Sequence, residues 1–72
     1  MTGWAALANA IVKQAAQDYR DALKFLRKHP DSKEAMATAM EVEDFFHSDW
    51  YALLTTLDPE VLINRLRKEA MK

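Results

Sequence analysis

The segment from residue 45 to residue 63 constrains the fold of this chain more than any other. It contains two helix-start signals ten residues apart, Ser48-Asp49 and Asp58-Pro59. A short polar side chain caps a helix by accepting a hydrogen bond from its first turn, and proline suits the first helical position. Four of the chain's seven aromatic residues also lie in this segment. Such dense apolar side chains between closely spaced helix starts predict short helices that fold back on the rest of the chain.

Length and composition point to one small helical domain. The 72 residues are near the lower size limit for a self-sufficient hydrophobic core, and no cysteine is present to add a disulfide. Half of the residues are apolar, only one is glycine and two are proline, and alanine is abundant. We therefore predict an all-α fold, with residues 1–72 forming a single helical domain that either packs well alone or gains core by self-association.

Apolar residues at three- and four-residue spacing predict a long first helix over residues 4–28. Thr2 is its expected N-cap, the basic pair Arg27 and Lys28 suits its C-terminus, and Pro30 disfavours its continuation. The residues of its apolar stripe are Trp4, Leu7, Ala8, Ile11, Val12, Ala15, Tyr19, Ala22, Leu23 and Leu26.

Three further helices are expected. A capping box, Asp31-Ser32-Lys33-Glu34, predicts that Asp31 caps the second helix. Ser48 is the predicted cap of the third helix, which lasts about two and a half turns. Asp58 is the predicted cap of the fourth helix. The expected buried residues of these helices are Ala35, Met36, Ala39, Met40, Val42, Phe46, Trp50, Leu53, Leu54, Leu57, Leu62, Ile63 and Leu66. The predicted architecture is a small bundle of one long N-terminal helix, a second helix, a short third helix and a C-terminal helix packed back on it.

The chain resembles small uncharacterised all-helical proteins encoded by phages and mobile elements of Gram-positive gut bacteria. In that group a long amphipathic helix precedes an aromatic segment of the form FF-x-S-D-W and a short leucine-rich tail. The residues that carry the resemblance are Ile11 to Ala15, Asp18 to Arg20, Phe45 to Leu54, Leu57-Asp58 and Leu62-Ile63. The resemblance implies a helical fold and a mobile-element origin, and it carries no functional residues.

Catalytic and metal-binding patterns are weak in this sequence. A single glycine rules out a glycine-rich phosphate loop, and the two serines, Ser32 and Ser48, fall where helix caps belong. His47 follows Glu43 by four residues and Asp44 by three, a spacing found in helical metal sites, but a second such motif is lacking. We predict no catalytic, metal or cofactor site, and no enzyme activity.

The aromatic segment supplies the candidate partner-binding residues. Trp50 is spaced with the leucines that follow it, so it is predicted to be core together with Phe46. Tyr51 points away from that line, and Phe45 lies at the edge of the second helix's apolar face. Together with His47, Tyr51 and Phe45 are the predicted contacts for a protein partner.

Charge is segregated along the chain. Residues 41–60 contain six acidic residues and no lysine or arginine, whereas both flanks are basic. Complementarity with helix dipoles is the simpler explanation, and a docking surface is the other. A net charge of −1 and a pI of about 6.1 argue against a nucleic-acid binder. Four basic residues of the first helix, Arg20, Lys24, Arg27 and Lys28 (the basic strip), remain candidate phosphate contacts.

Two functions from different classes follow. The first is a small interaction module that binds a protein partner through a helical face, with or without self-association. Self-assembly without any other partner is a related alternative. The second is a nucleic-acid-associated factor that uses the basic strip and the C-terminal cluster Arg65, Arg67 and Lys68. The start lacks a basic leader region and no apolar run reaches the roughly 18 residues of a membrane span, so we expect a cytoplasmic protein without membrane association.

Overall fold

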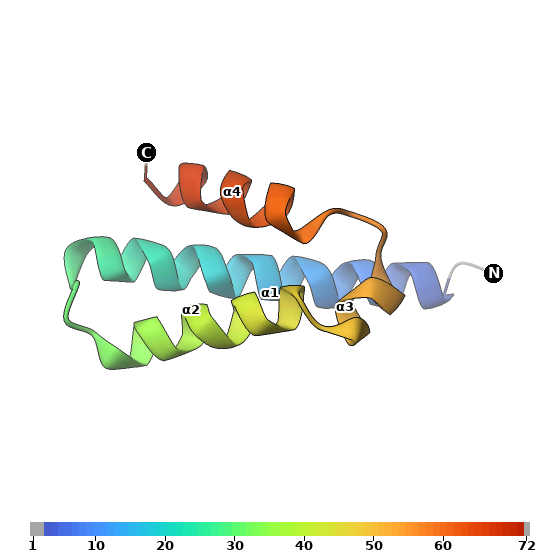
Figure 1. Ribbon diagram of the computed structural model, residues 1–72, viewed down its shortest axis with the longest axis horizontal. Coiled ribbons are helices and arrows are strands. Elements are labelled where there is room, and N and C mark those ends of the chain that lie inside the picture. The colour runs from blue at the N-terminus through green and yellow to red at the C-terminus, as the bar shows by residue number, and fades with distance from the viewer. Residues whose placement is uncertain (1–2, 72) are drawn as a thin grey trace.

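The computed structural model describes residues 3–71 and has four helices in this range, as predicted. They are α1 (Gly3–Lys28), α2 (Lys33–Phe46), α3 (Asp49–Leu54) and α4 (Pro59–Ala70), and no strand occurs among the described residues. In Figure 1, α2 runs back along α1, and α3 lies beside the N-terminal part of α1. The last helix, α4, packs on the other side of α1 and runs in the same direction as α1. The predicted all-α bundle is confirmed. The expected cap Thr2 lies outside the described residues.

Short polar side chains start the last three helices. The Oγ of Ser48 accepts a hydrogen bond from the backbone N–H of Tyr51 at 3.2 Å, and Asp58 Oδ1 accepts from Glu60 N–H at 2.9 Å, which confirms both predicted caps. The predicted cap of α2 is wrong by one residue. Ser32 is the N-cap, with its Oγ 3.2 Å from the N–H of Ala35, because Asp31 is still within the turn that follows α1.

The core lies where α1, α2 and α4 pack together. Tyr19 of α1 and Phe46 of α2 are its fully buried large side chains, with 0% and 1% of their surface exposed. The edge of one ring meets the face of the other, with centroids 6.0 Å apart. Ile63 and Leu66 of α4 complete this cluster. The sequence prediction that Phe46 is core is therefore confirmed.

The two aromatic residues of α3 are reversed relative to the prediction. Trp50 is 52% exposed, whereas Tyr51 is 2% exposed and packs its ring on Phe46. Because the cap at Ser48 fixes the start of α3, positions 51 and 54, one turn apart, face the core. Leu53 is consequently 68% exposed instead of buried. The predictions of Trp50 and Leu53 as core and of Tyr51 as exposed are wrong.

The third helix is also shorter than expected. It ends at Leu54, because the next residue, Thr55, has an extended backbone (φ −159°, ψ 155°) and its Oγ1 accepts a hydrogen bond from Leu57 N–H. Leu57 therefore lies in the loop before α4. Its side chain is exposed, contrary to the prediction that it is buried.

The first turns of α1 extend beyond the helices that pack on it. Trp4 and Leu7 belong to the predicted buried stripe, but they are 57% and 54% exposed. At 1.5 Å per residue, the 26 residues of α1 span about 39 Å and the 14 residues of α2 about 21 Å. Only Ala8 is buried among residues 3–10.

Two methionines of α2 also differ from the prediction. Met36 and Met40 are exposed, whereas Ala35 and Ala39 are the buried residues of this part of the helix.

Candidate interaction surfaces

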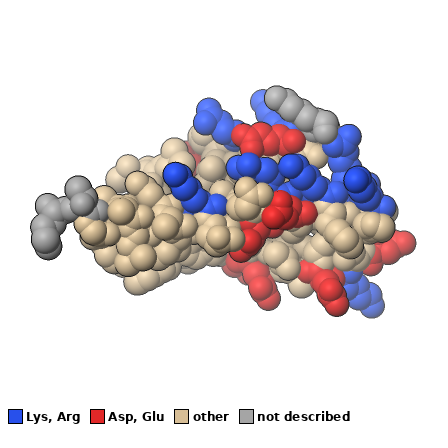
Figure 2. All heavy atoms as spheres, turned by 180° about the vertical axis from the view of Figure 1, so that it is seen from behind, with Lys and Arg blue, Asp and Glu red and all other residues tan. Residues whose placement is uncertain are grey.

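Two segments at one end of the molecule contain no charged residues: residues 3–12 of α1 and residues 50–57, which cover α3 from its second residue and the loop after it. We call these two segments the uncharged end. Asp49 and Asp58 directly flank the second segment and line a hollow together with its residues. On the face that Figure 2 shows, the described surface at the left is tan, and the blue and red side chains gather away from it. The exposed large apolar residues of the uncharged end are Trp4, Leu7, Trp50, Leu53 and Leu57.

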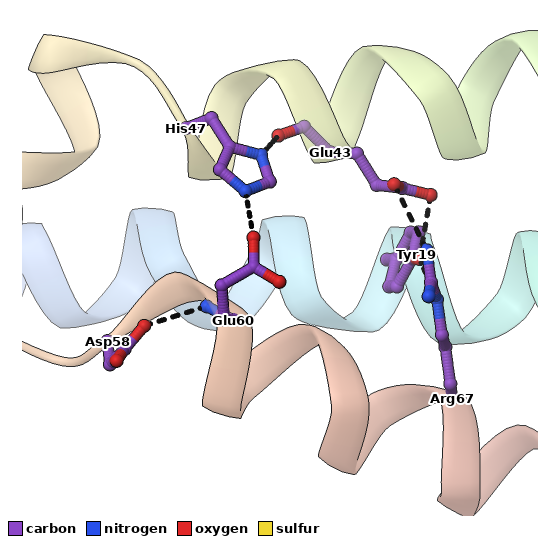
Figure 3. A network of polar contacts seen from close by, with 6 residues as sticks. All are labelled: Tyr19, Glu43, His47, Asp58, Glu60 and Arg67. Atoms are coloured by element: carbon purple, nitrogen blue, oxygen red, sulfur yellow. Dashed lines mark hydrogen bonds and ion pairs between the residues drawn. The ribbon is translucent and has the colours of Figure 1, made fainter.

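A polar cluster borders the core where the three long helices meet. The Tyr19 hydroxyl donates to Glu43 Oε2 at 2.8 Å and accepts from Arg67 Nε at 3.1 Å. Arg67 Nη2 also pairs with Glu43 Oε1 at 3.2 Å. Figure 3 shows these side chains converging from α1, α2 and α4. Each polar group of the cluster thus has a partner, and the three long helices are tied together at one point.

Burial raises the pKa of the Tyr19 hydroxyl, and the hydrogen bond from Arg67 opposes this shift. Tyr19 therefore stays protonated over the ordinary pH range and can donate to Glu43. The hydrogen bond to Tyr19 is also the main reason that the pKa of Arg67 is raised. A neutral donor, a carboxylate and a cation in this arrangement satisfy one another, which is typical of a structural network.

His47 joins the end of α2 to the start of α4. Its Nδ1 lies 2.9 Å from the backbone oxygen of Glu43 and its Nε2 lies 2.6 Å from Glu60 Oε1 (Figure 3). Both oxygens are acceptors, so this geometry favours a proton on each ring nitrogen. The hydrogen bond to Glu60, followed by the one to the Glu43 carbonyl, raises the pKa of His47.

The three residues predicted to contact a partner have different environments. Phe45 is half-buried and lines a shallow hollow between α1 and α2, together with Ile11 and Val42. His47 is exposed but already paired with Glu60. Tyr51 is buried, and its hydroxyl donates to the Leu57 carbonyl at 3.0 Å. Tyr51 cannot serve as an exposed contact, and the prediction for it is wrong in this structure.

The basic strip on α1 lies next to the C-terminal part of α4. Arg20 Nε is 3.1 Å from Glu69 Oε2, and Arg27 Nη1 donates to the carbonyl of Ala70 at 3.2 Å. Lys24, Arg27 and Lys28 line a surface hollow together with Ala70. Figure 2 shows blue side chains over this part of the molecule. The fold thus brings the basic strip beside the basic residues of α4, while Arg20 and Arg27 also fasten α4 to α1.

The sites that sequence patterns suggested for chemistry have structural explanations. The hydroxyl of Ser48 accepts from Tyr51 N–H and donates to the Phe45 carbonyl at 2.6 Å, and that of Ser32 caps α2. Within residues 3–71, no group of three or more histidine or acidic side chains is arranged to hold a metal ion. In the same range, none of the helices has both the length and the apolar character needed to cross a membrane.

Comparisons with known proteins give no further guide to this site. A scan against family models, a search of curated proteins and a search of solved structures each found no significant match. The candidate site therefore rests on the residues of this chain and their geometry.

Two features of the site escape sequence reasoning. Trp4 and Leu7 fit the apolar stripe of α1, and their exposure follows only from where α2 and α3 end. The sequence places Arg67 only in the C-terminal basic cluster, whereas in the structure its long side chain reaches across to Tyr19 and Glu43. The absence of any charge over residues 3–12 was the available signal for the first feature.

Proposed function

We propose that this protein is a small non-catalytic interaction module that binds a protein partner through the uncharged end. The observation that supports the proposal is the exposure of two tryptophans and three leucines in segments without any charged residue. Tryptophan is among the residues most enriched in the energetically dominant parts of protein interfaces, and charged residues are depleted there. A cytoplasmic location and the mobile-element origin implied by the resemblance are parts of this proposal.

The exposed apolar residues are also held in place. Trp50 and Leu53 are on a helix capped by Ser48 and anchored by buried Tyr51 and Leu54. Trp4 and Leu7 are on a continuous helix whose later turns form the core. Side chains on rigid elements lose less conformational entropy on binding than side chains on loops. The surface is therefore suited to bind without rearrangement of the backbone.

Site-specific photo-crosslinking in cells that naturally express the chain tests this proposal. A photoreactive amino acid replaces Leu7 or Leu53 at the uncharged end, and Met36 or Met40 on α2 as matched exposed apolar controls. We expect discrete protein adducts from Leu7 and Leu53 and none from the α2 positions. Equal adducts at all four positions, or no adduct at Leu7 and Leu53, would contradict the proposal.

A second candidate function is contact with nucleic-acid phosphates. It is favoured by the position of Lys24, Arg27 and Lys28 beside the end of α4, where Arg67 and Lys68 occupy the last turn. Against it, these cations also complement the negative ends of two helices, and the net charge of the chain is −1.

A titration with duplex and single-stranded DNA separates the two functions. If phosphate contacts form, binding should weaken steeply with salt and be reduced in the double variant Lys24→Gln/Lys28→Gln. Lys13→Gln, in the N-terminal half of α1 and outside the basic strip, is the control and should bind like the wild type. The absence of binding at low salt would remove the nucleic-acid candidate and leave the protein-binding proposal in place.

A further inference from the structure

We propose that a hollow between the C-terminal ends of α1 and α4 binds an aliphatic carboxylate. The alkyl chain lies on the apolar floor of the hollow, and the carboxylate lies against Lys24, Arg27 and Lys28. The C-terminal ends of the two helices lie side by side at the same end of the molecule (Figure 1). The site is separate from the uncharged end and is independent of the proposed function.

The floor of this hollow is apolar. It is lined by Leu23 and Leu26 of α1 and by Ala70 and Met71 at the end of α4, and its volume is about 360 Å³. Small-molecule sites have volumes of roughly 300–1,000 Å³ and are lined mainly by apolar side chains with a few polar groups. The hollow extends over residues 23–27 of α1, which is about one helical turn or roughly 6 Å. It therefore suits a short or medium alkyl chain.

Cations border the apolar floor. A second hollow, lined by Lys24, Arg27, Lys28 and Ala70, adjoins the first and shares Arg27 and Ala70 with it. Arg27 is held at this junction, because its Nη1 donates to the Ala70 carbonyl at 3.2 Å. Lys24 and Lys28 take part in no ion pair among residues 3–71. A ligand that fills both hollows has an apolar body with an anionic group next to it.

The local charge stays positive when the neighbouring groups are counted. Two carboxylates on this face, Glu43 and Glu69, are each already paired with an arginine. The C-terminal ends of α1 and α4 contribute about half a negative charge each, or about one together. The three cations of the second hollow outweigh this sum. An anion is therefore the complementary ligand, although the net charge of the whole chain is −1.

The lining of the apolar hollow favours an alkyl chain over a peptide or a nucleic acid. Its two polar side chains, Arg27 and Arg67, are hydrogen-bond donors, and no carboxylate, amide or hydroxyl acceptor lines it. A peptide in the hollow would remove water from its backbone N–H groups without giving them acceptors, whereas an alkyl chain has no polar group to desolvate. Nucleic-acid phosphates would contact the cations and leave the apolar floor uncovered.

Amide NMR of the full chain, titrated with octanoate, tests the proposal. Acetate supplies the carboxylate without the chain, and octylammonium supplies the chain with the opposite charge. We expect octanoate to give saturable shifts at the amides of residues 23–28 and 67–71, and the other two compounds to give none there over the same concentrations. Hexanoate should bind at least about threefold more weakly than octanoate, because fewer methylene groups leave water.

Two variants with matched controls separate the apolar and the charged contributions. Met71→Ser removes apolar surface from the hollow and should weaken octanoate binding about threefold, whereas Met40→Ser, at an exposed position on α2, should not. Lys24→Gln/Lys28→Gln should weaken binding about fivefold, because two surface ion pairs are lost. Lys13→Gln, outside both hollows, should bind like the wild type.

The absence of saturable octanoate shifts at residues 23–28 and 67–71 would overturn the proposal, and so would equal affinities of the wild type and both hollow variants. Octanoate shifts centred on residues 50–57 would also overturn it, because they would show that the alkyl chain binds exposed apolar surface without regard to charge. Each of these results leaves the proposed function in place, since crosslinking at Leu7 and Leu53 probes a different surface.

Discussion

The core and the uncharged end of this molecule use the same kinds of side chain in opposite ways. At the core, Tyr19 and Phe46 are fully enclosed, and the one polar atom of this pair is satisfied by Glu43 and Arg67. At the uncharged end, Trp4 and Trp50 keep about half of their surface exposed, and no charged side chain from residues 3–12 or 50–57 covers them. The difference lies in what surrounds each aromatic residue. Three helices meet around Tyr19, whereas only α1 and short α3 meet at the uncharged end.

The largest expected effect comes from emptying the packed core. Phe46→Ala removes a buried ring that contacts Tyr19 and Tyr51, and we expect the free energy of unfolding to fall by about 3–5 kcal/mol. Urea denaturation followed by circular dichroism measures this loss. Phe45→Ala, at the adjacent half-buried position, is the control and should cost clearly less. Equal losses at positions 45 and 46 would show that the core is placed wrongly.

A smaller loss is expected from the polar cluster that closes the core. Tyr19→Phe keeps the ring but leaves Glu43 and Arg67 without the shared hydroxyl, at a cost of about 1–3 kcal/mol. A double-mutant cycle with Arg67→Met measures the coupling between the two side chains, which we expect to exceed about 0.5 kcal/mol. Strictly additive losses would mean that the two side chains act independently, in conflict with the network seen here.

At the uncharged end, a large aromatic residue should contribute little to the stability of the single chain. Trp50→Ala removes a half-exposed side chain, so we expect the free energy of unfolding to change by no more than about 1 kcal/mol at concentrations where the chain is monomeric. Its neighbour provides the contrast, because Tyr51→Ala should cost about 3–5 kcal/mol. The reverse ranking of these two variants would place Trp50, and not Tyr51, in the core.

The smallest effect concerns His47, which lies between the two regions. Because its pKa in the folded chain is raised above 6.5, its interaction with Glu60 stabilises the fold fully below about pH 6.5 and is lost as the pH rises through the folded-state pKa. Thermal unfolding of the wild type and His47→Gln across this range measures the difference. The melting temperatures should lie furthest apart at acidic pH and converge at alkaline pH. A gap that is constant with pH would show that His47 does not titrate against Glu60.

Local signals in the sequence predict the fold well. The caps at Ser48 and Asp58 are strong because a hydroxyl or carboxylate at that position satisfies an otherwise unpaired backbone N–H, whatever the rest of the chain does. At the start of α2 two polar residues, Asp31 and Ser32, compete for this role, and only the path of the turn after Pro30 decides between them.

The candidate site could not be predicted to the same degree. Apolar spacing identifies which residues share a helix face, but it does not tell whether another helix covers that face. Trp4 has the spacing of a core residue and lies beyond the end of α2, and Trp50 has core neighbours in the sequence but follows a cap that turns Tyr51 inward. Arg67 reaches its partners across more than twenty residues of sequence, which helical periodicity cannot detect. The exposed surface depends on tertiary contacts and not on local pattern.

Both tryptophans of this chain, Trp4 and Trp50, lie at the uncharged end, so their fluorescence reports on that end alone. Acrylamide quenching at a concentration where light scattering shows a single chain is therefore the most direct test of the claim that this end is a surface and not a core. We predict red-shifted emission and strong quenching of both tryptophans in the folded single chain, with protection appearing only when a partner binds. Blue-shifted emission that resists the quencher in the single chain would contradict the claim.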